Sequence, residues 1–482
     1  MIDGFQEHRL GDLKLYSGKE LPIRELMDVS GSKVGYLLGI AVGMNAPETP
    51  NTLTLPFEKS VKDFWTRFEN WLDDAAGRYA FVVNPSDGPR LYTDPVGMIG
   101  AVYNSEDGYV ASSPMLAIKR PLRPNPKFDF DVIRNRAGKL TLFHTADEDV
   151  KRLNPSYYLD LNTLEPSRFW PRNVSFKLEP ENPIDIYEEI ITTARANIGA
   201  IAKDYRCSLP VSGGMDSRLL LAFAGPHLDK IDQFYTHINN YSTRRDAAIA
   251  QELCNLCKVE HDVHDRRHFG IGPREVRLNQ RAHELTYGAP ASPPVEYRNG
   301  VIKGVPEGNV ILRGHQTDLL RAVYVFRPQP EWRDPDWQIE RLLVVPRADF
   351  NSTIADRFRD DFVAWQSTLP DTAMDKAADF MFLEVYSNSS IGASFPALWR
   401  NFYMSPYNSR RLITLSLQFS EKRRRASEPV FELIEMMNKD FSRVPFDSEA
   451  PPSLDDKQEW SVGAKSTLKR RERTVEKLLK YA

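Results

Sequence analysis

The fold is decided by Ser212-Gly213-Gly214-Met215-Asp216-Ser217, a stretch that joins an apolar run at 209–211 to a helix-like run at 218–223. Its two glycines allow a tight turn and a close approach of the backbone to a ligand, because neither carries a Cβ. The amides of such a turn and of the helix behind it form an anion site suited to phosphate. The stretch therefore predicts a strand, a phosphate-binding loop and a helix in succession.

Asp216 adds a carboxylate to this loop. A carboxylate beside bound phosphates is the usual way in which a protein holds Mg²⁺, so Asp216 is a candidate metal ligand. The pattern differs from the P-loop in which lysine follows the second glycine, since no lysine follows here. We expect the loop to bind the pyrophosphate part of a nucleotide together with its metal.

The segments that follow indicate the type of sheet. Residues 233–237 have the pattern of a strand, and 247–253 have the pattern of a helix. Strands that alternate with helices are typical of a doubly wound parallel sheet, which makes the fold class α/β. Ligands of such sheets bind at the carboxyl ends of the strands, where this loop lies.

Length and charge limit the classes of protein. A chain of 482 residues is expected to hold two or three domains. The formal net charge of −3 disfavours a nucleic-acid partner and a tRNA-modifying enzyme. The longest apolar run, 34–44, is too short and glycine-rich to span a bilayer, and 1–9 lacks the apolar core of a secretion signal. We expect a cytoplasmic protein with no membrane partner.

The three cysteines disfavour a disulfide framework. Cys254 and Cys257 have the C-x-x-C spacing, and His261 and His264 follow them, so a zinc site is one interpretation. The cysteines fall inside a helix-like run, however, and no second C-x-x-C pair completes a closed site. Burial as small apolar side chains is the favoured alternative.

The N-terminal part of the chain is rich in short strand-like runs separated by turn residues. The runs are 33–42, 79–83, 90–93, 100–103 and 109–111. A polar link with two prolines, 177–183, predicts a boundary between domains 1–176 and 184–482. Helices are expected at 184–203, 377–386, 410–418 and 428–437.

The glycine stretch resembles the S-G-G-x-D-S loop of the PP-loop ATP pyrophosphatases, which cleave ATP between the α and β phosphates. Further segments resemble the asparagine synthetase family. They are Gly-Arg-Tyr-Ala-Phe-Val-Val at 77–83, Asp-Pro-Val-Gly at 94–97, Leu-Asn-Pro-Ser at 153–156 and Arg-Phe-Trp at 168–170. The order of these segments implies an N-terminal nucleophile-type (Ntn) αββα domain ahead of a PP-loop synthetase domain with a helical C-terminal part.

Glutamine-hydrolysing members of that family use an N-terminal cysteine as the nucleophile. Here the second residue is Ile2, and the earliest cysteine is Cys207. The resemblance therefore implies a degenerate glutaminase-like domain that makes no ammonia, as in β-lactam synthetases and some lasso-peptide cyclases.

A second phosphate-side motif lies at 310–318, where an apolar run ends in Arg-Gly-His-Gln-Thr-Asp. Such a run predicts a buried strand that opens on the same crevice. The segment is similar to the family's G-E-G-x-D-E motif, which implies that Gly314 lies at the nucleotide and that Asp318 helps to bind Mg²⁺. Gln316 replaces the second glycine, and Leu319 replaces the final acid.

His315 occupies the Glu position of that motif, where β-lactam synthetases carry a tyrosine thought to act as a base. A neutral imidazole can take a proton from an attacking amine, so His315 is a candidate catalytic base. The alternative is a histidine that only makes backbone hydrogen bonds.

The resemblance extends to three further places. It implies that adenine lies against the backbone near Tyr235 to His237. The segment 457–461 is similar to a late K-x-x-F-S motif whose lysine stabilises charge on the phosphates, which points to Lys457, with Lys465 as the second choice. The segment 402–409 resembles E-x-R-x-P-F-x-D. It lacks the charged residues there, which implies an unusual substrate.

The expected function is that of an ATP- and Mg²⁺-dependent, AMP-forming ligase that adenylates a small-molecule or peptide carboxylate and transfers the acyl group to an amine. An amine in the same molecule would close a ring, and a precursor peptide would then be a partner. One alternative is an ammonia-dependent amidotransferase that acts on a sugar acid or amino acid, with or without a partner glutaminase. The other is a catalytically silent scaffold that keeps ATP affinity.

Overall fold

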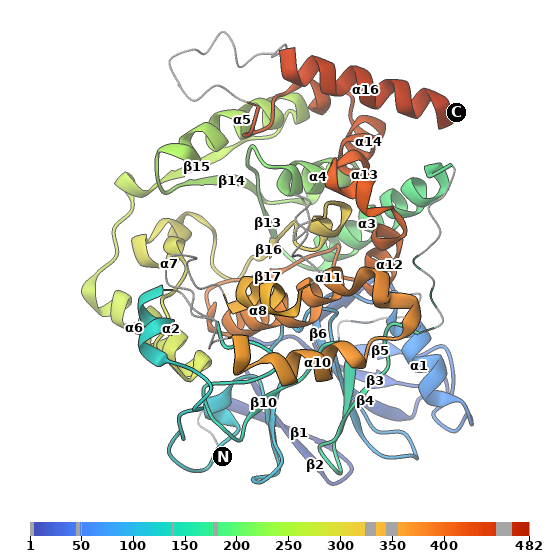
Figure 1. Ribbon diagram of the computed structural model, residues 1–482, viewed down its shortest axis with the longest axis vertical. Coiled ribbons are helices and arrows are strands. Elements are labelled where there is room, and N and C mark those ends of the chain that lie inside the picture. The colour runs from blue at the N-terminus through green and yellow to red at the C-terminus, as the bar shows by residue number, and fades with distance from the viewer. Residues whose placement is uncertain are drawn as a thin grey trace. The chain divides into compact units, whose positions relative to one another are not determined.

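The computed structural model describes residues 4–44, 49, 51–136, 139–172, 174, 176, 182–322, 334–343, 355–449 and 465–481. The chain forms two compact units, and Figure 1 labels helices and strands of both. Unit 1 contains 1–174, 283–291 and 330–397, and unit 2 contains 175–282, 292–329 and 398–482. These units differ from the predicted domains 1–176 and 184–482, because 283–291 and 330–397 belong to unit 1.

Unit 1 is built on a seven-stranded sheet in the order β12-β11-β7-β6-β4-β3-β5. The strands are β3 (Ile23–Met27), β4 (Lys33–Val42), β5 (Thr52–Thr54), β6 (Ala76–Val83), β7 (Arg90–Thr93), β11 (Tyr157–Asp160) and β12 (Pro166–Arg168). All neighbours are antiparallel except β3 and β5. The central strand β6 is buried along its whole length, which makes this sheet the core of the unit.

Two smaller sheets complete the strands of unit 1. A hairpin is formed by β1 (Phe5–Leu10) and β2 (Leu13–Gly18), and a three-stranded sheet by β8 (Val102–Asn104), β9 (Tyr109–Ala111) and β10 (Lys151–Arg152). The strands predicted at 33–42, 90–93 and 109–111 are confirmed with their bounds. The unit is thus a mixed-sheet α/β structure, and the Ntn type stays a prediction.

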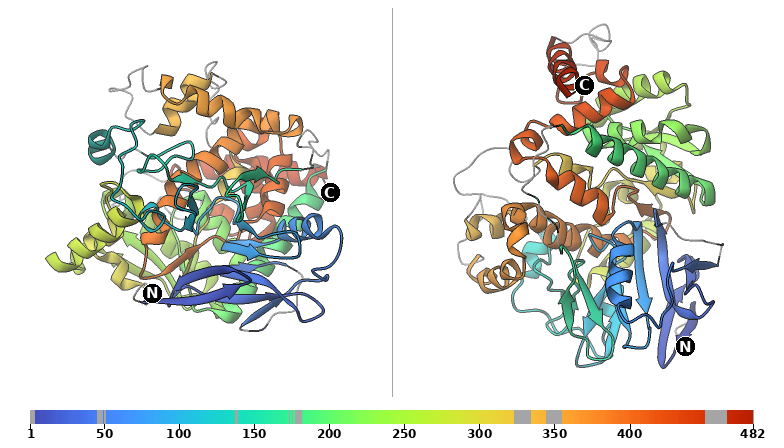
Figure 2. Two further views of the ribbon diagram at one scale, coloured as in Figure 1. Left: turned by 90° about the horizontal axis from the view of Figure 1, so that it is seen from below. Right: turned by 90° about the vertical axis from the view of Figure 1, so that its right-hand side faces the viewer.

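Figure 2 shows α1 (Phe64–Leu72) beside this sheet, and aromatic side chains make the contact. The Phe68 ring lies 5.8 Å from that of Phe81 in β6 and 5.2 Å from that of Tyr92 in β7. Phe64, Phe68 and Leu72 recur at helical spacing, so one face of α1 is buried while the other meets solvent.

The later helices of unit 1 are α8 (Pro335–Leu343), α10 (Arg359–Ser367) and α11 (Ala377–Phe380), after the short α2 (Phe130–Arg136). The helix predicted at 377–386 changes type, because a π-helix runs from Met381 to Gly392. Ser390 and Ser394 donate hydrogen bonds to main-chain carbonyls four residues earlier. Such bonds compete with the regular helix ladder, and the periodicity of the sequence does not reveal them.

A buried ion pair holds the π-helix in unit 1. Arg168 donates through Nη1 to Glu384 Oε1 at 2.7 Å and through Nη2 to Oε2 at 2.8 Å. Asn154 and Trp365 donate to the same carboxylate at 2.9 and 2.7 Å. The segments at 153–156 and 168–170, quoted above for their resemblance, thus meet at one buried glutamate.

Unit 2 is built on a five-stranded parallel sheet in the order β15-β14-β13-β16-β17. The strands are β13 (Cys207–Pro210), β14 (Gln233–Ile238), β15 (Asp262–Asp265), β16 (Val310–Leu312) and β17 (Phe402–Met404). The parallel α/β sheet predicted from the glycine stretch is confirmed. Strand order runs outward from β13 on one side and from β16 on the other, so the direction reverses between these two strands. β17 was not predicted.

The predicted helices of unit 2 are confirmed or extended by α3 (Ile184–Asp204), α4 (Met215–Ala224), α5 (Tyr241–Cys257), α12 (Arg410–Gln418) and α14 (Glu428–Met437). The unit also contains α7 (Val295–Asn299), α13 (Glu421–Arg425), α16 (Lys465–Tyr481) and most of α6 (Pro273–Tyr287), whose residues from 283 onward belong to unit 1. α5 begins earlier than predicted because Asn240 and Thr243 form a capping box at its start.

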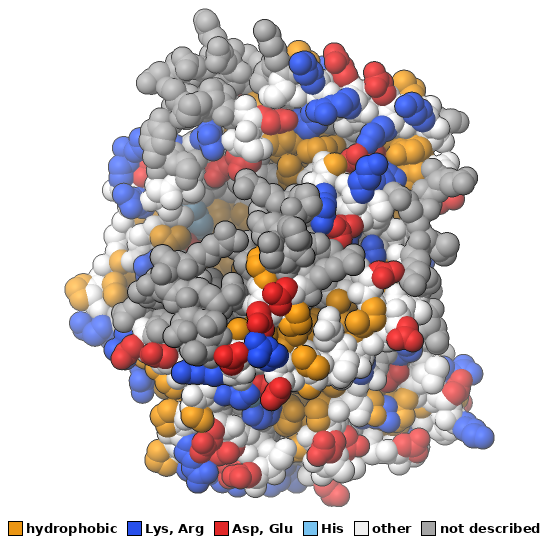
Figure 3. All heavy atoms as spheres, viewed as in Figure 1, with side chains coloured by type: hydrophobic (Ala, Val, Ile, Leu, Met, Phe, Trp, Pro, Cys, Tyr) orange, Lys and Arg blue, Asp and Glu red, His pale blue; other side chains and the backbone are white. Residues whose placement is uncertain are grey.

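Several basic side chains of α16 form ion pairs with acids of neighbouring segments. Arg471 contacts Glu435 of α14 at 3.1 Å, and Lys477 pairs with Glu428. At the top of Figure 3, blue and red side chains accordingly alternate over this part of the surface. None of the described helices combines the length and apolar composition that a membrane crossing requires.

Candidate functional site

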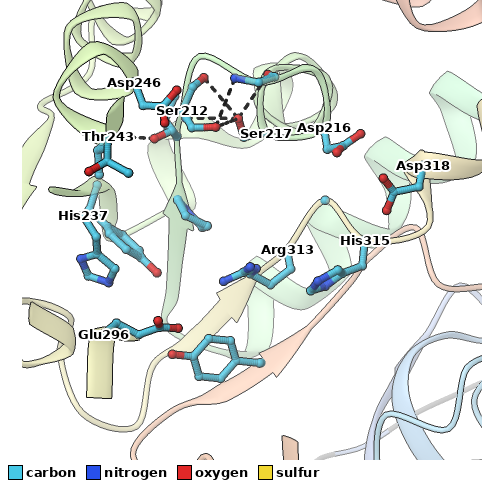
Figure 4. Close-up of a pocket in the computed structure, with 17 residues that line it drawn as sticks. Ser212, Asp216, Ser217, His237, Thr243, Asp246, Glu296, Arg313, His315 and Asp318 are labelled. Atoms are coloured by element: carbon cyan, nitrogen blue, oxygen red, sulfur yellow. Dashed lines mark hydrogen bonds between the residues drawn. The ribbon is translucent and has the colours of Figure 1, made fainter. Parts of the chain in front are cut away.

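A cavity of about 350 Å³ opens in unit 2 where the strand order reverses (Figure 4). Pockets that bind small molecules commonly measure roughly 300–1,000 Å³. Its lining comes from the carboxyl ends of the parallel strands and from the segments that follow them. The lining residues are Pro210, Val211, Ser212, Gly214, Asp216, Ser217, Tyr235, Thr236, His237, Thr243, Asp246, Glu296, Arg313, Gly314, His315, Asp318 and Tyr403. The two motifs singled out in the sequence, around 212–217 and 314–318, therefore share one cavity.

The two glycines of the loop have different surroundings. Gly214 is the N-cap of α4, with φ −76° and ψ 165°, a conformation that any residue adopts. A Cβ on Gly214 would have only Ser212 Oγ near it, at 3.5 Å, so this glycine leaves space in the cavity. Gly213 is not among the lining residues. A Cβ there would lie 2.7 Å from Ile249 Cδ1 and 3.1 Å from Asp447 Cβ, so a larger residue would fit only if these side chains moved.

Several loop amides are already hydrogen-bonded within the protein. Ser212 N–H donates to Ser217 Oγ at 3.1 Å, and Gly214 N–H donates to Ser212 Oγ at 3.3 Å. Gly213 N–H donates to Asp246 Oδ1 at 3.3 Å. The donors left for a ligand are therefore the first amides of α4, whose N-cap residue supplies no side-chain acceptor. The anion site thus offers fewer free amides than the sequence predicted.

Asp216 and Asp318 point toward one another at one end of the cavity (Figure 4). Both contact a third residue, Arg321, which follows the 3₁₀ helix η5 (Thr317–Leu320). Arg321 Nη2 lies 2.6 and 2.8 Å from the oxygens of Asp216 and 2.7 Å from Asp318 Oδ1. Thr317 Oγ1 donates to Asp216 Oδ1 at 3.2 Å. The two predicted metal ligands are thus brought together, with a guanidinium nitrogen between them.

Crowding of the two carboxylates shifts the proton affinity of one of them. Burial, and then the negative charge of Asp216, raise the pKa of Asp318 to about 7, against the opposing effect of Arg321. A carboxyl group with a raised pKa near a second carboxylate is a site that would gain from a further positive charge.

The donor set fits Mg²⁺ in the form in which it accompanies phosphates. Mg²⁺ usually takes one or two carboxylates and completes its shell with water and phosphate oxygens. Asp216 and Asp318 supply two such carboxylates, which lie close together. In the described part of the chain, no cluster of three or more His, Cys, Asp or Glu side chains could hold a metal by itself. The cysteines of the C-x-x-C pair lie in α5 as free thiols, and burial raises their pKa values.

Gly314 brings the second motif against the glycine loop. A Cβ on Gly314 would lie 2.7 Å from the main-chain oxygen of Asp216 and 3.1 Å from its Cβ, so only glycine permits this approach. Gln316 takes φ 69°, the left-handed region that glycine would occupy without strain. Leu319 is buried in the core and does not line the cavity, although the resembling motif has an acid at this position.

His315 lines the middle of the cavity beside Arg313 (Figure 4). Burial, with a smaller contribution from the positive charge of Arg313, lowers the pKa of His315 to about 3. The imidazole is therefore neutral near physiological pH, as a base must be, but it is a weak one in this environment. An anion bound nearby would raise its proton affinity.

Aromatic rings and one acid line the end of the cavity away from Asp216. The rings of Tyr235 and His237 lie 4.8 Å apart, and Tyr235 is buried. Burial, and then the proximity of His264 and Arg313, lower the pKa of His237 to about 3, which keeps this ring neutral. Figure 4 shows Glu296 of α7 near His237. Apolar ring faces with a few polar groups are typical of a site for a flat heterocycle.

Some cavity residues were missed by sequence reasoning. Arg313 directly follows β16, so the rule that ligands meet strand ends could have identified it. Asp246, Glu296 and Tyr403 come from α5, α7 and β17, and only the packing of distant segments brings them to the loop. Arg321 was missed although it lies three residues after Asp318.

Other predicted residues cannot be compared with the cavity. Lys457 and Ile2 lie outside the described residues, and Lys465 begins α16 without a described side chain.

Comparison of the chain with known protein families and with curated proteins finds no match.

Proposed function

We propose that the cavity of unit 2 binds ATP and that the protein is an AMP-forming ligase of the PP-loop type. The observation that carries this proposal is the convergence of two motifs on one cavity. Gly314 touches the backbone of Asp216, and the carboxylates of Asp216 and Asp318 meet beside the start of α4. Two acids beside open helix amides suit a triphosphate with its metal better than they suit a plain anion.

The nucleotide would extend along the cavity. Its phosphates would accept hydrogen bonds from the first amides of α4, with Ser212 and Ser217 fixing the loop and Gly214 leaving room. Its base would rest near Tyr235 and His237. Asp216 and Asp318 would hold Mg²⁺, which when bound supplies charge neutralisation that improves pyrophosphate as a leaving group.

The proposed reaction has two steps. A carboxylate oxygen of the substrate bonds to the α phosphorus, and the bond to the bridging oxygen of pyrophosphate breaks, which gives an acyl-adenylate. An amine nitrogen then bonds to the acyl carbon, and AMP leaves. His315 would accept the proton of the amine once the negative nucleotide has raised its basicity, and Arg313 offers a positive charge beside it.

Nucleotide binding can be tested with α,β-methylene-ATP, which resists cleavage between the α and β phosphates. In Gly214→Ala the new methyl group enters open cavity space without backbone strain, so folding should be kept while affinity falls at least tenfold, about 1.4 kcal/mol. Gly225→Ala at the other end of α4 is the matched control, because nothing lies within 4 Å of its Cβ position. Calorimetric titrations of the wild type and both variants measure the effect.

The proposal fails if the wild type does not bind the analogue, or if Gly214→Ala binds it as well as Gly225→Ala does. Adenylation itself is tested by exchange of labelled pyrophosphate into ATP across a panel of carboxylates. Exchange with a peptide or amine-bearing carboxylate and no added nitrogen source supports ring closure. Product formation that requires ammonium salts supports the amidotransferase alternative, and tight ATP binding without exchange supports the scaffold alternative.

For unit 1 we propose a degenerate glutaminase-like domain. Its mixed sheet, with the buried Glu384 and Arg168 joining the segments that resemble the family, supports a structural role. In this proposal the unit supplies no ammonia, so the full chain should release none from glutamine.

A further inference from the structure

Arg321 does not bind its two carboxylates as arginine usually does. An arginine paired with a carboxylate commonly offers two nitrogens in a fork. Here the three contacts, with Asp216 Oδ1, Asp216 Oδ2 and Asp318 Oδ1, all fall on Nη2. One Nη2 carries two hydrogens, so at least one of them is shared between two of the three oxygens. The nitrogen acts as a point of positive charge between two acids, and the rest of the fork is left unused by them.

The position of Nη2 is the position that a bridging metal ion needs. A cation shared by Asp216 and Asp318 would have to lie between the same oxygens, at about 2.0–2.1 Å for Mg²⁺. The guanidinium nitrogen at 2.6–2.8 Å fills that gap. The two cations therefore exclude one another, and Arg321 must leave before a metal can bridge the acids.

A departing Arg321 needs another anionic partner. Its side chain is about a third exposed, at 29%, and among the described residues its buried Nε has no hydrogen-bond partner. In the described part of the chain, Arg321 forms no ion pair other than those with Asp216 and Asp318. The start of α4, where Asp216 lies, is the place proposed above for the phosphates, and phosphate oxygens accept strongly from guanidinium.

We propose that Arg321 is a built-in counter-ion that makes metal binding conditional on the nucleotide. Without nucleotide, Arg321 neutralises Asp216 and Asp318 and keeps divalent cations out. A triphosphate draws the guanidinium to its own oxygens, and the freed carboxylates then take the metal. Arg321 thereby becomes a phosphate-positioning residue, and metal and nucleotide bind together. This inference rests on the proposed function for its ligand, while the exclusion of the metal rests on the geometry alone.

The test measures Mn²⁺ binding to the full chain by electron paramagnetic resonance, with and without α,β-methylene-ATP. The wild type should bind Mn²⁺ at least tenfold more tightly when the analogue is present. Arg321→Gln should bind Mn²⁺ without nucleotide at least tenfold more tightly than the wild type does, because the acids are free. Its affinity for the analogue should fall at least tenfold, and Arg321→Lys should restore part of the exclusion.

A double variant, Arg321→Gln with Asp318→Asn, should lose the nucleotide-free Mn²⁺ site, which shows that the ion sits on these acids. Thermal unfolding of each variant verifies that it is folded. The inference is overturned if Arg321→Gln excludes Mn²⁺ as the wild type does, or if the wild type binds the analogue and yet binds Mn²⁺ equally with and without it. If Arg321→Gln gains the Mn²⁺ site but no form of the protein binds the analogue, the proposed function fails while the counter-ion role stands.

Discussion

The two arginine–carboxylate clusters of the molecule, one in each unit, are built in opposite ways. In unit 1, Arg168 grips Glu384 through two nitrogens, and Asn154 and Trp365 complete the shell of a fully buried carboxylate. In unit 2, one nitrogen of Arg321 serves two half-buried carboxylates, those of Asp216 and Asp318.

The pKa values express the difference. Burial by itself would raise the pKa of Glu384, but the charge and hydrogen bonds of Arg168 hold it below its usual value. At Asp318, burial and Asp216 prevail, and the pKa rises to about 7. A satisfied carboxylate contributes to the fold, whereas two acids that share too little positive charge are arranged for a ligand that brings more. Disruption of the Glu384 cluster should therefore lower stability, whereas disruption of the Asp216–Asp318 cluster should weaken ligand binding.

The largest expected effect is on stability. Glu384→Gln leaves the Arg168 charge buried without a counter-charge, which should lower the free energy of unfolding by about 3–5 kcal/mol. Urea unfolding followed by circular dichroism measures this loss. Glu307→Gln, which removes the exposed partner of Arg400, is the control and should cost about 0–1 kcal/mol. Equal costs for the two variants would show that the Glu384 cluster is not a structural one.

The next effect is on binding. Asp216→Asn removes one of the two carboxylates and should weaken the affinity for α,β-methylene-ATP in the presence of Mg²⁺ about a hundredfold, or about 2.7 kcal/mol. The free energy of unfolding should change little, because Arg321 keeps Asp318 as a partner. Asp229→Asn, an exposed site on the segment after α4, removes the same charge elsewhere in unit 2 and should leave affinity unchanged. Calorimetric titration compares the two, and a similar loss in both would point to overall charge.

The smallest effect is a dependence of stability on pH. Because the pKa of Asp318 is raised to about 7, from roughly 3.9 in an unfolded chain, the folded protein binds this proton more tightly. The stabilisation is present below about pH 4 and is lost as the pH rises toward 7, with a slope of at most about 1.4 kcal/mol per pH unit.

Unfolding of the wild type and of Asp318→Asn between about pH 5 and about pH 8 tests this dependence. The difference in stability between the two proteins should change with pH in favour of the variant as the pH rises. Glu384 gives the opposite sign, since its lowered pKa makes its contribution disappear only as the pH falls. A constant difference between the wild type and Asp318→Asn would contradict the crowding of the two acids.

The sequence predicted the parallel sheet of unit 2 through local signals. Strands at 233–237 and 310–312, and helices after the glycine loop, follow from apolar periodicity and turn residues that act within a few positions. The same signals predicted that Asp216, Gly314, His315 and Asp318 follow the ends of strands. The rule that ligands bind at the carboxyl ends of parallel strands therefore predicted that these residues share a cavity.

Three features depended on contacts between residues far apart in the chain. Residues 330–397 belong to unit 1, where Glu384 accepts hydrogen bonds from Asn154 and Arg168. The short β17 pairs with β16, and Asp246 of α5 accepts a hydrogen bond from the Gly213 N–H. None of these pairings leaves a period or a turn signal in the sequence.

By itself, then, the sequence determined the succession of strand, glycine loop and helix in unit 2, the strand and helix that follow, and the kinds of residue at these strand ends, because backbone preferences and apolar spacing are local properties. The tertiary structure alone decided which charges neutralise one another. Electrostatic energy depends on the distance between side chains in space, and the approach of Arg321 to two acids at 2.6–2.8 Å is set by how η5 packs beside α4.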